Sequence, residues 1–114
     1  MSALTDKLVA YGCNIDDAMG RFLNNEAFYA KCYGKFIEDK SFERLGENLR
    51  AGDVRASFEA AHDLKGISAN MGITPVFDLV VVLVEELRAG RMPDNAQETY
   101  QKLLDMRDEL KTFV

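Results

Sequence analysis

The chain has 114 residues, the size of one domain, and 47% of them are hydrophobic, as in a globular protein rather than a disordered one. Acidic residues outnumber basic ones by 19 to 14, which gives a net charge of −5. Nucleic-acid binders carry clustered Lys and Arg, whereas here the basic residues are scattered among acidic ones. The composition therefore argues against a nucleic-acid partner, and the length argues against an enzyme with a nucleotide-binding fold.

The ends and the cysteines exclude further classes. Residues 1–7 lack the basic start and apolar run of a signal peptide, and the longest apolar run, residues 79–84, is far too short to span a bilayer. We therefore expect a cytoplasmic protein without membrane contact. Cys13 and Cys32 form no CxxC pair, and with a single histidine they cannot supply the four ligands of a structural zinc site. Two free, buried thiols and no metal are expected.

Helical spacing of apolar residues, interrupted by Gly, Asn, Ser, Asp and Pro, divides the chain into helices. Asn14, Ser41 and Thr74 are predicted N-caps, and Pro75 suits a first helical turn. On the third helix, Phe28, Cys32 or Tyr33, and Phe36 are predicted to share one stripe. The expected helices span residues 4–11, 15–23, 26–38, 42–50, 53–71, 74–89, and about 93–113.

Residues 80–84 could also be a strand, because four of the five are valines. The cap before them, the continuation through residues 85–88, and the lack of a second strand to pair with favour a helix. Short connections make successive helices antiparallel. We therefore predict a single all-α domain over residues 1–114: an up-and-down antiparallel four-helix bundle with one or two short N-terminal helices.

His62 is the only histidine, and imidazole is a good neutral nucleophile near pH 7. On a helix over about residues 53–72, Lys65 and Gly66 lie one turn further along on the same side. This arrangement suits a histidine that accepts a phosphoryl group. The ammonium offsets the charge of the phosphate, and the glycine leaves room for a partner's active site.

A helical projection indicates how His62 is presented. It projects roughly 140° from the centre of the apolar face, so it should lie at the rim of the core or outside it. The small Ala69 lies on the histidine's side. Phe58, one turn before His62, is predicted either to pack in the core, which we favour, or to back the ring and line a docking surface. Asp63 points towards solvent, where it could tune the imidazole.

The string from His62 to Gly72 resembles the signature of histidine-containing phosphotransfer (HPt) domains, the helical carriers of phosphorelays. The residues in step with that signature are His62, Leu64, Lys65, Gly66, Ala69, Asn70 and Gly72, with Met71 where Leu is usual. The resemblance implies that His62 accepts a phosphoryl group from a receiver-domain aspartate, usually on Nε2, and passes it to another receiver. It further implies that Lys65 steadies the phosphate and that Gly66 keeps the approach open. Phe58, Gly66 and Ala69 are the candidate residues of a partner-docking surface.

The resemblance also bears on partners and cofactors. The expected partners are receiver domains of response regulators or hybrid histidine kinases, and they should supply the magnesium. No cofactor is expected, and the absence of a P-loop or kinase signature predicts a phosphocarrier without ATP-dependent kinase activity. A monomer is expected. Two alternatives stay open: a catalytically silent helical interaction module, and the phosphoacceptor domain of a chemotaxis-type kinase. The start of the chain at Met1 argues against the second alternative.

Overall fold

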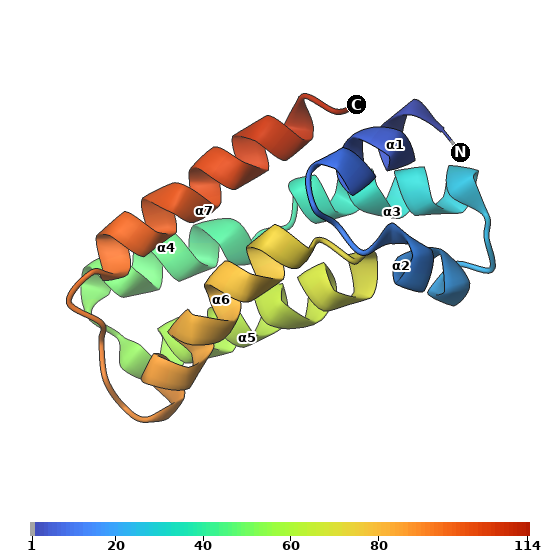
Figure 1. Ribbon diagram of the computed structural model, residues 1–114. Coiled ribbons are helices and arrows are strands. Elements are labelled where there is room, and N and C mark those ends of the chain that lie inside the picture. Colours follow the sequence, from blue (N-terminus) through green and yellow to red (C-terminus); the bar gives the residue numbers. More distant parts are fainter. Residues whose placement is uncertain (1) are drawn as a thin grey trace.

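The computed structural model describes residues 2–114, so Met1 lies outside the described part. Within residues 2–114 it contains seven α-helices and no strand (Figure 1). The helices are α1 (Ala3–Ala10), α2 (Ile15–Arg21), α3 (Glu26–Ile37), α4 (Ser41–Ala51), α5 (Val54–Met71), α6 (Thr74–Arg88) and α7 (Ala96–Lys111).

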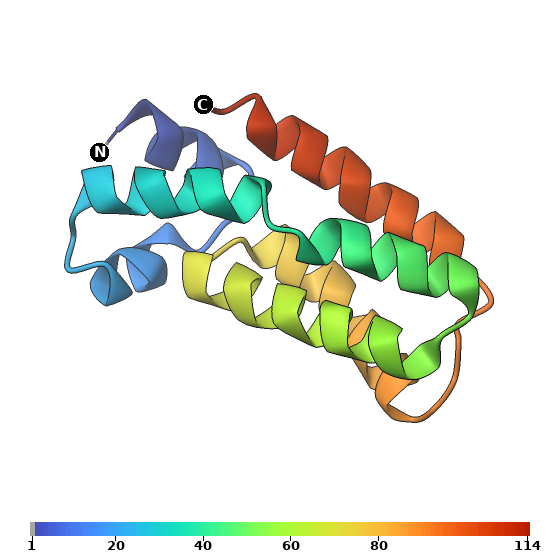
Figure 2. The ribbon, with the colours of Figure 1, turned by 180° about the vertical axis from the view of Figure 1, so that it is seen from behind.

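Four helices, α4 to α7, form an up-and-down antiparallel bundle. α5 packs against α4 and α6, and α7 closes the bundle by contacting both of them. Figures 1 and 2 show α3 lying end to end with α4 along the long axis, with the short helices α1 and α2 at the same end. The predicted four-helix bundle with short N-terminal helices is confirmed, because short connections leave neighbouring helices no room for another arrangement.

Buried aromatic rings join the two halves of this elongated molecule. Consecutive ring centroids along the series Phe22, Tyr29, Tyr33, Phe36 and Phe42 lie 5.2, 6.4, 6.3 and 5.8 Å apart. The buried hydroxyl of Tyr29 donates a hydrogen bond to the carbonyl of Met71 (2.7 Å), and that of Tyr33 donates to the carbonyl of Leu110 (2.6 Å). These bonds tie α3 to the C-terminal ends of α5 and α7.

The predicted stripe on α3 was wrong at its start. Phe28 is 51% exposed, whereas Tyr29 is fully buried. Cys32 is only half-buried, while Tyr33 and Phe36 are buried. α3 is rotated so that both tyrosines face the bundle, where their hydroxyls reach carbonyl groups in the last turns of α5 and α7.

Of the three predicted caps, only Asn14 is confirmed; its Oδ1 accepts a hydrogen bond from the backbone N–H of Asp17. Ser41 lies inside α4, and its own N–H donates to Oδ1 of Asp39 at 2.9 Å. Thr74 is the first residue of α6, and its hydroxyl accepts a hydrogen bond from the N–H of Asn14. The predictions for Ser41 and Thr74 were wrong because each residue interacts with a neighbouring segment or side chain instead of capping its own helix.

Residues 80–84 are helical, as predicted, and lie within α6. Val80, Leu83 and Val84 are buried, while Val82 is 64% exposed on the other side of the helix. Both cysteines are free; Cys13 is buried and Cys32 is half-buried, so the prediction of two buried thiols holds for Cys13 alone. None of the described helices is long and apolar enough to cross a membrane.

Candidate functional site

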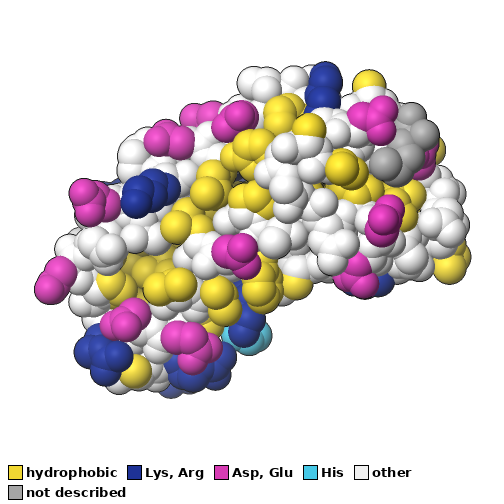
Figure 3. Space-filling model, in the orientation of Figure 1, with side chains coloured by type: hydrophobic (Ala, Val, Ile, Leu, Met, Phe, Trp, Pro, Cys, Tyr) yellow, Lys and Arg dark blue, Asp and Glu magenta, His cyan; other side chains and the backbone are white. Residues whose placement is uncertain are grey.

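α5 presents His62 because its core face is on the opposite side. Asp53 caps the helix by accepting a hydrogen bond from the N–H of Ala56 (3.0 Å). The buried residues recur at helical spacing: Ser57, Ala60, Ala61, Leu64, Ser68 and Met71. His62 is exposed, and Figure 3 shows the cyan imidazole at the molecular surface. Its predicted position outside the core is confirmed.

Phe58 and His62 lie one turn apart, with ring centroids separated by 5.7 Å and planes inclined by 38°. Phe58 is half-buried and packs against the core. The guanidinium carbon of Arg88, at the end of α6, lies 5.1 Å from the centroid of the Phe58 ring. Phe58 therefore does both things considered from sequence: it packs on the core and it contacts the imidazole.

The stretch of α5 after His62 offers a cation and an open surface. Lys65 is half-buried, and within residues 2–114 no carboxylate lies within 4.0 Å of its ammonium. Gly66 and Ala69 are exposed. A Cβ placed on Gly66 would meet no atom of another element within 4 Å. Gly66 is therefore not needed for helix packing, and the space beside it is free for another molecule.

A groove of about 450 Å³ runs along the other flank of His62, between α4 and α5. It is lined by Asp39, Ser41, Arg44, His62, Asp63, Gly66 and Ile67. Nη2 of Arg44 lies 2.8 Å from Oδ2 of Asp63 and 2.7 Å from Oγ of Ser41. Asp63 is thus paired across the helix interface rather than pointing freely into solvent.

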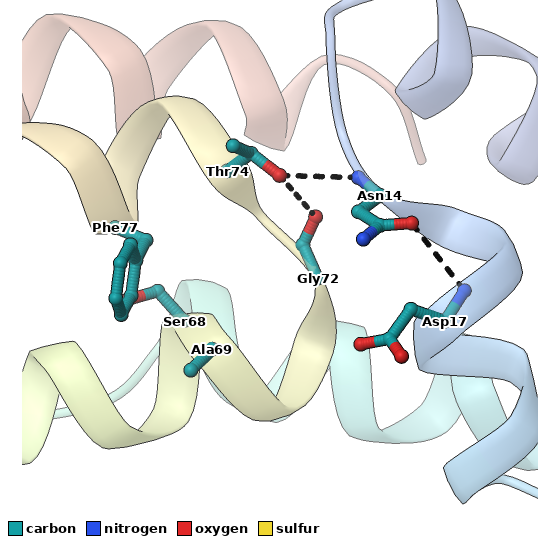
Figure 4. Close-up of a pocket in the computed structure, with 7 residues that line it drawn as sticks. All are labelled: Asn14, Asp17, Ser68, Ala69, Gly72, Thr74 and Phe77. Carbon is teal, nitrogen blue, oxygen red and sulfur yellow. Dashed lines mark hydrogen bonds between the residues drawn. The ribbon is translucent and has the colours of Figure 1, made fainter.

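A second, smaller pocket of about 180 Å³ lies at the C-terminal end of α5, where α2 and α6 meet it (Figure 4). The N–H of Asn14 donates to the carbonyl of Gly72 (2.9 Å) and to Oγ1 of Thr74 (3.2 Å). Gly72 ends α5 with φ 72°, and a Cβ there would lie 2.5 Å from the carbonyl oxygen of Asn14. Only glycine permits both this turn and the close approach of α2.

Arg21 of α2 secures the same end of α5. Its guanidinium donates to the carbonyls of Ala69 (2.8 Å) and Asn70 (3.1 Å) in the last turn of α5. The carbonyl of Ala69 also accepts from the N–H of Gly72 (3.2 Å). Asp17 pairs with Arg21 at 2.6 Å. The N-terminal helices therefore hold the helix that carries His62.

A scan against protein-family models matches residues 39–113 to the Hpt domain, about two thirds of the chain, including all four bundle helices and His62. The chain belongs to the Hpt domain family. Membership implies histidine phosphotransfer in a phosphorelay and interaction with receiver domains. Searches of curated proteins and of solved structures gave no match.

In this Hpt domain the structure brings Phe58, His62, Lys65, Gly66 and Ala69 to one exposed side of α5 or to its border with the core. Sequence reasoning missed Ser41, Arg44 and Arg88, which come from α4 and α6. No fixed spacing links those residues to His62. The only signal in the sequence was their charge or polarity. Within residues 2–114 no group of three or more His, Cys, Asp or Glu residues could hold a metal ion.

Proposed function

We propose that this Hpt domain accepts a phosphoryl group on His62 from the phosphorylated aspartate of one receiver domain and transfers it to the aspartate of another. The observation that supports this most directly is the setting of the single histidine. It is exposed on the bundle surface, with the Lys65 cation one turn away and open space beside Gly66. A receiver domain can bring its active site onto such a surface without displacing any helix.

The chemistry requires little of this chain besides the nucleophile. The lone pair of Nε2 in the neutral imidazole attacks phosphorus in line with the aspartyl oxygen. The N–P bond forms as the P–O bond breaks, the carboxylate leaves, and the other ring nitrogen keeps its proton. A second receiver reverses these steps. The receivers supply the magnesium in this scheme, so no metal or cofactor site is proposed on the Hpt domain.

The surrounding residues have separate roles in this scheme. Lys65 offsets negative charge on the phosphoryl group, as a nearby ammonium does for any anion. Gly66 and Ala69 let a receiver come close to the helix surface, because glycine has no side chain and alanine has only a methyl group. Phe58 limits the orientations of the imidazole through ring contact. We further propose that residues 1–114 act as one domain, which is supported by the hydrogen bonds of Tyr29 and Tyr33 from α3 into the bundle. We propose that this domain is a monomer.

The test is phosphoryl transfer from receivers charged with radiolabelled acetyl phosphate. Profiling all receivers of the source organism would identify the partners. Wild-type protein is expected to acquire a label that is acid-labile and base-stable, and His62→Gln should acquire none while keeping its helical circular dichroism. A label that survives in His62→Gln contradicts the assignment. Receiver binding without any transfer would indicate a silent interaction module.

A further inference from the structure

The groove between α4 and α5 places a second cation on the flank of His62 away from Lys65. Successive residues of a helix are rotated by about 100° around its axis. Asp63, one residue after His62, therefore projects to the α4 side of His62, and Lys65, three residues after His62, projects to the α6 side. Arg44 of α4 pairs with Asp63 and lines the same groove as His62 and Gly66. The imidazole is therefore bracketed by Lys65 on one flank and by the Arg44–Asp63 pair on the other.

Arg44 has hydrogen-bonding capacity left over. Guanidinium carries five N–H donors. Only Nη2 is used, in the bonds to Ser41 and Asp63; for Nε and Nη1 there is no hydrogen-bond partner in the described part of the chain. The Arg44 side chain is 48% exposed and that of Asp63 is 52% exposed. An ion pair this exposed is weak, so Asp63 does not hold the guanidinium firmly.

Phosphorylation of His62 changes the balance of charge in this groove. A phosphoryl group brings close to two negative charges and three strong acceptor oxygens. Guanidinium binds phosphate in a bidentate manner, which favours phosphate over a single carboxylate contact. Asp63, the next residue after His62, would repel the new charge, and Asp39 adds a further carboxylate to the groove. Arg44 is the cation in the groove that can offset the negative charges of the phosphoryl group and of these carboxylates.

We propose that Arg44 is a phosphate-binding residue: it is held by Asp63 while His62 is unmodified and moves to the phosphoryl group once His62 carries it. This inference rests on the proposed function of His62. It assigns opposite effects to two residues that form one ion pair. Arg44 favours the phosphorylated state of His62, whereas Asp63 opposes it, both by repulsion and by competing for the guanidinium.

The decisive measurement is the pKa of the phosphoryl group on His62, followed by phosphorus-31 NMR after phosphorylation with phosphoramidate, a small donor that needs no receiver. Arg44→Gln should raise this pKa, because a cation near the phosphate is lost, and Asp63→Asn should lower it. Arg44→Lys should restore a value close to wild type. Arg55→Gln is the matched control, because it breaks an exposed ion pair with Glu59 elsewhere on α5.

Transfer from a phosphorylated receiver gives a second readout. Arg44→Gln should slow formation of phosphorylated His62 by about fivefold, the size expected for one exposed charge interaction, and Asp63→Asn should not slow it. If the two substitutions shift the pKa in the same direction, or if Arg44→Gln matches Arg55→Gln, the pair serves only to join α4 and α5 and the inference is wrong. Failure of every receiver to label His62, with the opposite pKa shifts intact, would overturn the proposed function but not the contact of Arg44 with the phosphate.

Discussion

The rings of Phe58 and His62 contact each other one turn apart on α5, with centroids 5.7 Å apart and an inclination of 38°. The guanidinium carbon of Arg88 lies over the same Phe58 ring, 5.1 Å from its centroid. A flat, half-buried ring beside an exposed imidazole limits how the imidazole can rotate. It also links the orientation of His62 to the packing of α5 against α6.

Replacing Phe58 by Leu tests this link. The substitution keeps an apolar side chain of similar size, so the free energy of unfolding should fall by only about 1 kcal/mol. Phosphoryl transfer to His62 should slow severalfold, because the imidazole loses its flat neighbour. The control is Phe113→Leu, which alters a half-buried ring packed edge-on against Tyr11. Equal transfer rates in the two variants would show that Phe58 only packs.

Replacing Lys65 by Ala should slow transfer or shorten the lifetime of the phosphorylated state, because a positive charge one turn from His62 is lost. The fold should be little affected, with a change in unfolding free energy within about 0.5 kcal/mol. Lys102→Ala removes an exposed lysine of α7 and serves as the control. Wild-type kinetics in Lys65→Ala would mean that Lys65 is an ordinary solvated residue.

Replacing Gly66 by Gln should move stability and function in opposite directions. The space beside Gly66 is open, and a glycine within a helix costs about 0.5–1 kcal/mol relative to a better helix former, so thermal stability should rise. Transfer should fall, because the new side chain stands where a receiver must approach. Gly34→Gln is the matched control: Gly34 lies within α3 and also has open space, so it should be stabilised without loss of transfer. A destabilised yet fully active Gly66→Gln would place the docking surface elsewhere.

Cys13 should make stability depend on pH in the alkaline range. Burial raises the pKa of the Cys13 thiol from its ordinary value of 9.0 to about 11, partly opposed by a hydrogen bond with the backbone of Thr74. Because the folded state favours the protonated thiol, its contribution is complete below about pH 9 and is lost as the pH rises to about 11.

The free energy of unfolding, measured by denaturant titration at successive pH values, should therefore fall from pH 9 upwards. Burial also raises the pKa values of Tyr29 and Tyr33, whose ordinary value is 10.0, so the comparison between pH 9 and 10 is the most specific for the thiol. Cys13→Ala should flatten the decline in that interval. An identical slope in this variant would show that the thiol ionises equally well in the folded and unfolded chains.

Interactions within a few residues of one another were predictable, because helical geometry relates positions i, i+3 and i+4 without reference to the rest of the fold. The placement of Lys65 and Gly66 one turn beyond His62 depends on that geometry alone. The end of α5 at Gly72 follows from another local signal, a glycine that can adopt the left-handed conformation. The antiparallel bundle followed from the short connections between successive helices. The candidate nucleophile and its immediate neighbours along α5 could therefore be named before the structure was known.

Relationships between helices depended on how each helix is rotated about its axis, and local spacing does not encode that rotation. Tyr29 rather than Phe28 turned inward because its hydroxyl reaches the carbonyl of Met71 across the core. Arg44 pairs with Asp63, and Arg88 lies over the ring of Phe58, only because α4 and α6 pack on either side of α5. Side-chain packing over the whole bundle sets those rotations, so the charges that flank His62 from neighbouring helices became visible only in three dimensions.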